Sequence, residues 1–296
     1  PMVFEAIHSC LAASEMDFNS FRELQKATVL SVATQAAKTE EFLQLYDRMR
    51  KQNLKPLVVK GLICRNLYPH SDYRHSGDED VLCGEAAFKG CHKALIKWGM
   101  EPCDSSLESY EVSYRKDDSP LHIELHKTLF ASNSDIFSDC NRLFEQVFDH
   151  PVEVEIQGIP VATMEWSEHM LYLLIHAFKH FLHSGFGIRQ VCDIVLFANA
   201  YGEKVDWEWV LARCRGLRAD KFAAALFSIG EAYLGFSPER ARYPQCWKCI
   251  RVDHLPLLED LLQIKFCDFG RCTTAENTTC IQSGQTAFNQ HFHRRK

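Results

Sequence analysis

The chain has 296 residues, of which 46% are hydrophobic and 24% charged, a composition typical of a folded protein with one large or two ordinary domains. No apolar stretch approaches the ~20 residues that cross a bilayer, so we expect no membrane partner. The net charge of -6 disfavours a polynucleotide partner, because such proteins usually carry a basic face. The 13 cysteines follow no framework and the first residues lack an export signal, so we expect reduced thiols and a cytoplasmic location.

The first half of the chain alternates predicted helices with short strands. Apolar residues at helical spacing predict helix within residues 1–53. A buried strand at 54–60 leads into a Lys60-Gly61 turn, and we expect the next short helix to stop at Pro69. The sequence then predicts a strand at 80–83, an amphipathic helix at 85–100, paired strands at 110–116 and 121–129, and a hairpin at 152–164 that turns at Gln157-Gly158.

The pattern changes near residue 165, after which almost every segment has helical spacing. Helices are predicted at 167–183, at 188–201, from an N-cap at Asp206, and up to a C-cap at Gly235. We therefore expect two domains. Residues 1–164 form an α/β domain with N-terminal helices, and residues 165–296 form a helical domain.

Two aspartates flank a glutamate at the start of the predicted strand at 80–83. Asp78 and Asp80 are two residues apart, which on a strand places both side chains on one face and Glu79 on the other. Like charges so close repel each other unless a cation lies between them, and Mg²⁺ binds carboxylate oxygens together with water and phosphate. The alternative is a solvated acidic turn before a strand.

A third carboxylate comes from the later strand at 121–129. Its sequence alternates, so that Glu124 shares a face with His122 and His126 while apolar residues occupy the other face. The alternative is an ordinary half-exposed strand.

The ordered set of these segments resembles the nucleotidyltransferase superfamily with the polymerase-beta-like palm, and most of all its uncharacterised bacterial group. The resemblance covers residues 50–200 or so. Glu79 departs from it, because the residue between the two aspartates is commonly apolar in the family. The features that carry the resemblance are Lys60-Gly61, Leu67-Tyr68-Pro69, Arg74, Asp78 with Asp80, Glu124 within "IELH", His176 and Asp193-Ile194.

This resemblance implies an α+β fold: a palm with a mixed sheet and helices, followed by a helical C-terminal domain. It implies transfer of a nucleoside monophosphate from a nucleoside triphosphate, ATP in our reading, to a hydroxyl of a small molecule or a protein. Two Mg²⁺ or Mn²⁺ ions would assist an in-line attack. The metal ligands and catalytic acids would be Asp78, Asp80 and Glu124, and the residues facing the triphosphate would be Lys60, Gly61, Arg74 and Ser76.

Two other functions remain open at this stage. One is a non-catalytic nucleotide-binding or interaction protein on a degraded palm. The other is a nucleotidyltransferase-type antitoxin. Release of pyrophosphate in the presence of Mg²⁺ would separate an enzyme from the first of these.

Four histidines, His169, His176, His180 and His183, recur along one side of the predicted helix at 167–183. We expect His176 and His180 to contact the acceptor substrate, together with His122 and His126. A metal pair formed by His176 and His180, and a solvated helix face, are the alternatives.

Four cysteines near the C-terminus have a spacing that partly resembles a zinc site. A structural zinc ion and ordinary free thiols are both open, and we predict free thiols and no catalytic cysteine. These residues are Cys246, Cys249, Cys267 and Cys272.

Overall fold

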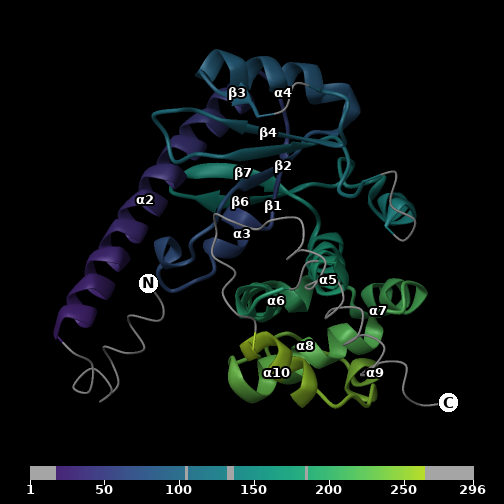
Figure 1. The fold of residues 1–296 in the computed structure, drawn as a ribbon. Helices are drawn as coiled ribbons and strands as arrows, with labels where there is room; N and C mark the ends of the chain where they lie inside the picture. The colour runs from purple at the N-terminus through teal and green to yellow at the C-terminus, as the bar shows by residue number, and fades with distance from the viewer. Residues whose placement is uncertain (1–17, 104–105, 132–136, 184–185, 264–296) are drawn as a thin grey trace. The chain divides into compact units, whose positions relative to one another are not determined.

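The computed structural model describes residues 18–103, 106–131, 137–183 and 186–263. Contacts divide the chain into two units, residues 1–164 and 165–296 (Figure 1). Among the described residues, every helix is too short or too polar to serve as a membrane span.

The first unit is built on a five-stranded mixed sheet in the order β1-β2-β5-β4-β3. The neighbours β2 and β5 are parallel, and every other pair is antiparallel. A separate hairpin is formed by β6 and β7. The strands are β1 (Leu57–Val59), β2 (Glu79–Leu82), β3 (Glu101–Pro102), β4 (Glu111–Arg115), β5 (Ile123–His126), β6 (Val152–Ile156) and β7 (Ile159–Thr163).

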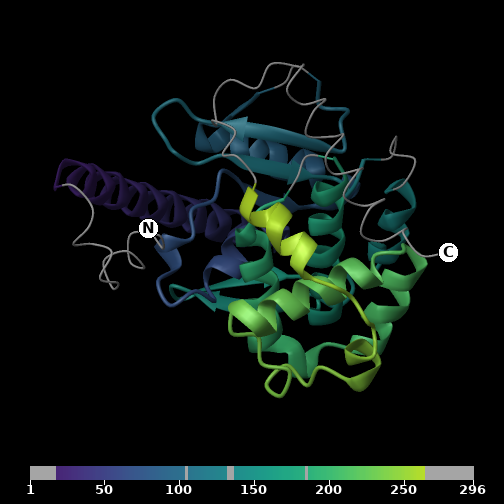
Figure 2. The ribbon, with the colours of Figure 1, turned by 60° about the horizontal axis from the view of Figure 1, so that its bottom comes forward.

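Helices of this unit cover one face of the sheet. Figure 2 shows α2 as a long helix that extends beyond the sheet. On the covered face, Glu79 of β2 lies 3.8 Å from Lys38 of α2, and Tyr114 of β4 lies 2.7 Å from the ring of His92 of α4. The opposite face of β2 therefore carries the side chain of Asp80. The helical segments are α2 (Phe18–Lys51), α3 (Gly61–Arg65), η2 (Ser71–Tyr73), α4 (Gly84–Trp98) and η3 (Ser138–Phe144).

Several elements predicted from the sequence are confirmed in this unit. The two strands predicted on either side of residues 117–120 pair as antiparallel neighbours. The predicted hairpin turns at Gln157 and Gly158, whose φ angles of 50° and 79° are those of a tight two-residue turn. The strand β2 begins at Glu79, so Asp78 lies immediately before the strand instead of within it.

The second unit is entirely helical in its described part, so the predicted α+β class with a helical second half is confirmed. Asp206 caps α7 as predicted, because its carboxylate accepts a hydrogen bond of 2.9 Å from the backbone N–H of Trp209. Aromatic side chains fill the core, including Trp207, whose ring lies 5.5 Å from that of Phe227. The helices are α5 (Trp166–His183), α6 (Ile188–Tyr201), η4 (Gly202–Lys204), α7 (Trp207–Gly216), α8 (Asp220–Tyr233), α9 (Gln245–Lys248) and α10 (Leu255–Gln263).

Candidate active site

Asp80 and Glu124 occupy neighbouring positions on the two parallel strands of the sheet. The register pairs Asp80 of β2 with Glu124 of β5, which puts both carboxylates on the same face. Asp80 is almost fully buried, while the side chain of Glu124 is 28% exposed. Two carboxylates held side by side in this way repel each other, so the site favours a bound cation.

His126 completes a group of three metal-ligating side chains. Its Nε2 lies 3.3 Å from Oδ1 of Asp80 and 3.6 Å from Oε2 of Glu124, and the ligand atoms of all three residues lie within 4.8 Å of one another. Burial alone would lower the pKa of His126, but its bonds to Asp80 and Glu124 and the charge of Glu111 raise that pKa to about 9. A protonated His126 therefore supplies positive charge to the carboxylates.

Lys60 supplies a second positive charge at the same carboxylate. Its Nζ lies 2.8 Å from Oδ1 of Asp80. Lys60 adopts a positive φ of 41° at the turn between β1 and α3, which is uncommon for a residue with a side chain. Burial would raise the pKa of Asp80, but Lys60 and His126 hold it below its usual value, so Asp80 is ionised.

The structure brings together only some of the residues predicted to hold metal or triphosphate. Asp78 is half-buried and does not belong to the group of Asp80, Glu124 and His126. Arg74 is buried at the end of η2. Ser76 lies on the other face of the sheet, where its hydroxyl is 3.1 Å from Glu79. The roles of Asp78, Arg74 and Ser76 remain predictions.

The predicted acceptor-binding histidines have different surroundings. His122 is exposed, and its backbone carbonyl accepts a hydrogen bond of 2.9 Å from the N–H of Glu79. His176 and His180 are half-buried neighbours on α5, with ring centroids 4.5 Å apart. Their contact with an acceptor remains a prediction, as does that of His126.

His169 does not belong to a polar stripe with the later histidines of α5. It is fully buried, and its ring lies 4.8 Å from that of Phe197 in the core of the second unit. Burial lowers the pKa of His169 to about 3, so this histidine is neutral. It is a core residue that stays neutral, because burying a charged imidazolium would cost far more than burying the neutral ring.

Sequence analysis missed the partners of Glu79. The side chain of Glu79 is fully buried and forms ion pairs with Arg65 at 2.9 Å and Lys38 at 3.8 Å. One signal was available: Lys38 lies four residues before Phe42 on the buried stripe of α2, so its side chain had to point inward.

The described cysteines are all free, and Cys246 and Cys249 lie at the start and the end of the short helix α9. Cys267 and Cys272 fall outside the described residues. The choice between zinc and free thiols at these four positions stays a prediction.

Residues 1–235 match the family described as uncharacterised nucleotidyltransferase, so the chain belongs to that family, as its motifs predicted. No curated protein is similar enough to match the chain. Two similar solved structures are of the antibiotic-resistance factor ANT(2'')-Ia. Its solution structure is 14% identical in sequence to this chain. The match covers 62% of this chain and 95% of the ANT(2'')-Ia chain, with a TM-score of 0.43. Its crystal structure with adenylyl-2''-tobramycin has 13% identity over 61% and 98%, with a TM-score of 0.42.

A third similar structure is that of an antigenic nucleotidyltransferase-like protein from Paracoccidioides brasiliensis. Its identity is 12% over 61% of this chain and 88% of that chain, with a TM-score of 0.38.

Proposed function

We propose that this protein transfers a nucleoside monophosphate from ATP to a hydroxyl group of a small molecule or a protein, with the help of Mg²⁺ or Mn²⁺. The observation that carries the proposal is the group of Asp80, Glu124 and His126 on adjacent parallel strands, in a chain of the nucleotidyltransferase family. A buried, ionised Asp80 beside a second carboxylate has the chemistry of a cation site.

The residues present fit a divalent metal. Carboxylate oxygens of Asp80 and Glu124 suit Mg²⁺ and Mn²⁺, and His126 would have to release its proton before its imidazole could ligate Mn²⁺. Asp78, directly before β2, is a further proposed ligand. A bound divalent ion would neutralise charge on the triphosphate and on the departing pyrophosphate.

The protein residues would position the reactants and move one proton. The acceptor hydroxyl oxygen forms a bond to the α-phosphorus of ATP, the bond from that phosphorus to the β-phosphate oxygen breaks, and pyrophosphate leaves. Glu124, the more exposed of the two paired carboxylates, accepts the proton of the attacking hydroxyl. Lys60, Gly61 and Arg74 are proposed to face the phosphates, with Lys60 best placed because its ammonium already lies at Asp80. Ser76, the fourth residue predicted there, would have to leave its hydrogen bond to Glu79 to reach them.

The test is a direct search for transfer. The purified chain is incubated with each labelled nucleoside triphosphate and Mg²⁺, against pools of hydroxyl-bearing metabolites and against lysate proteins. We expect pyrophosphate release and an acceptor that is heavier by one nucleoside monophosphate, both abolished by a chelator and by Asp80→Asn. Nucleotide binding without pyrophosphate release in any pool would contradict the proposal and favour a non-catalytic binding protein.

We also propose that the protein acts in the cytoplasm, where free thiols persist.

A further inference from the structure

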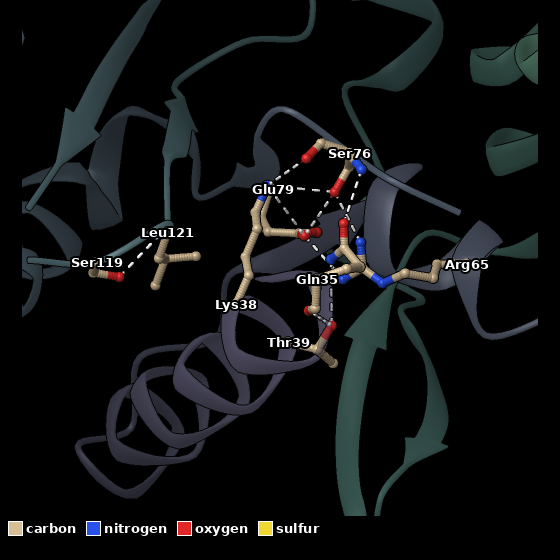
Figure 3. A network of polar contacts seen from close by, with 8 residues as sticks. All are labelled: Gln35, Lys38, Thr39, Arg65, Ser76, Glu79, Ser119 and Leu121. Carbon is tan, nitrogen blue, oxygen red and sulfur yellow. Dashed lines mark hydrogen bonds and ion pairs between the residues drawn. The ribbon is translucent and has the colours of Figure 1, made fainter. Parts of the chain in front are cut away.

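The acidic residue between the two aspartates is the centre of a buried polar cluster. Figure 3 shows Glu79 among side chains of α2, α3 and the loop before β2. Its Oε1 accepts hydrogen bonds from Arg65 at 2.9 Å and from the hydroxyl of Ser76 at 3.1 Å, and Nζ of Lys38 lies 3.8 Å away. Burial lowers the pKa of Lys38, and Glu79 partly offsets that effect. A carboxylate with two buried cations is held firmly in place.

The other oxygen of this carboxylate lies against the turn that carries Lys60. A Cβ atom added to Gly61 would lie 2.8 Å from Oε2 of Glu79, closer than real Cβ contacts. Among the described residues Oε2 has no hydrogen-bond partner, so its contact with this turn is one of packing. Glycine is needed at position 61 because the Glu79 carboxylate occupies the space of a side chain.

The same turn places the ammonium of the preceding residue in the candidate active site. Lys60 and Gly61 are adjacent, and Lys60 has its Nζ 2.8 Å from Asp80. Glu79 and Asp80 are adjacent on β2 with their side chains on opposite faces. Strand β2 therefore contacts the turn at two points: Glu79 packs against Gly61, and Asp80 forms an ion pair with Lys60.

We propose that Glu79 is a positioning residue: it fixes the Lys60–Gly61 turn by packing against Gly61 and so holds the Lys60 ammonium at Asp80. The effect of Glu79 on transfer rests on the proposed function, but its structural coupling to the Lys60–Gly61 turn does not. Arg65, at the other end of the single-turn helix α3, anchors the Glu79 carboxylate that does this.

The first test measures coupling in stability. Gly61→Ala is made in the wild-type chain and in a background with Arg65→Met and Glu79→Val, which removes Oε2 and the ion pair together. We expect a loss in Tm of about 5 °C in the wild-type chain and none in that background. Gly77→Ala is the matched control, because a Cβ there meets nothing within 4 Å, and it should leave Tm unchanged in both. Equal effects of Gly61→Ala in the two backgrounds would overturn the proposal.

The second test asks whether Glu79 acts through Lys60. Lys60→Met is combined with the Arg65→Met and Glu79→Val background, and kcat and the KM for the triphosphate are measured. We expect a loss in kcat/KM of about tenfold from the background alone, and no further loss when Lys60→Met is added. A folded background with wild-type kcat/KM would show that the cluster only stabilises the fold, and fully additive losses would show that Glu79 does not act through Lys60; either result overturns the proposal.

The experiment separates failure of this proposal from failure of the proposed function. If the wild-type chain shows no transfer, Mn²⁺ affinity measured by electron paramagnetic resonance replaces kinetics. Lys60→Met should then change the Kd for Mn²⁺ in the wild-type chain and leave it unchanged in the background, and equal changes would overturn the proposal. If the background does not fold, Gly61→Ala is compared with Gly77→Ala in the wild-type chain, and equal Tm values would overturn it.

Discussion

The two faces of strand β2 hold adjacent acidic residues in very different surroundings. Glu79 is enclosed by helices and accepts bonds from Arg65 and Ser76. Asp80 lies on the other face with Lys60, His126 and the partly exposed Glu124. The side with helices pairs one carboxylate with two cations, whereas the other side gathers three carboxylates, those of Asp80, Glu124 and Glu111, around the two cations Lys60 and His126. An excess of cations suits a fixed structural anchor, and an excess of carboxylates suits a site that binds a metal.

The largest effect is expected on the Asp80 face. Asp80→Asn keeps the shape of the side chain but removes the charge that a metal and Lys60 need, so Mg²⁺-dependent transfer should fall on the order of a thousandfold. The fold should persist, as judged by circular dichroism. Asp78→Asn is the informative companion, because Asp78 lies outside the group of three ligands. We expect it to abolish transfer as well, and normal turnover in that variant would remove Asp78 from the metal site.

The Glu79 face should respond in stability. Glu79→Ala leaves Lys38 and Arg65 buried without their carboxylate, which should lower the free energy of unfolding by about 3–5 kcal/mol in urea or thermal unfolding. Glu153→Ala is a matched control, because Glu153 is an exposed strand glutamate of the same unit, and it should change stability by less than about 0.5 kcal/mol. Similar values for the two variants would mean that the Glu79 cluster contributes little to folding.

A smaller effect is expected from the more exposed acid of the Asp80 face. Glu124→Gln removes the proposed proton acceptor but keeps the side chain's size, so kcat should fall about a hundredfold. The KM of the acceptor should change little, because the lost interaction belongs to the transition state. Steady-state kinetics at saturating Mg²⁺ would measure this. An unchanged kcat would assign the proton to another group.

The two faces of β2 also differ in how much of their structure could be predicted from the sequence alone. Alternation along "LHIELH" was enough to predict that Glu124 and His126 share a face, and the register with Asp80 follows from two neighbouring strands. The partners of Glu79 were harder to predict. Arg65 lies on a single-turn helix and Lys38 lies on a helix forty residues upstream or so, and pairing across such distances depends on tertiary packing. Polar residues on an apolar helix stripe were the only local signal.

The histidines of α5 show the same difference between what the sequence predicts and what the structure contains. Spacing placed four histidines on one side of a helix, but spacing does not show where the core ends. His169, near the start of α5, is fully buried next to Phe197, while His176 and His180, further along the same helix, are half-buried. A stripe drawn from periodicity can therefore cross from the interior to the surface along one helix.

The smallest effect is expected from the histidine pair on α5, which has surroundings unlike those of His126. His126 lies among three carboxylates, whereas the ring of His176 neighbours those of His180 and Tyr172, at 4.5 and 5.6 Å. The ring nitrogens of such a pair can form hydrogen bonds to a hydroxyl-bearing acceptor. His176→Ala or His180→Ala should therefore raise the KM of the acceptor, or lower kcat, by about tenfold, with little change in triphosphate affinity.

His183→Ala, at the exposed end of the same helix, is the control. If the acceptor kinetics of all three variants equal those of the wild-type chain, α5 does not contribute to the acceptor site; if triphosphate affinity changes instead, these histidines serve the nucleotide.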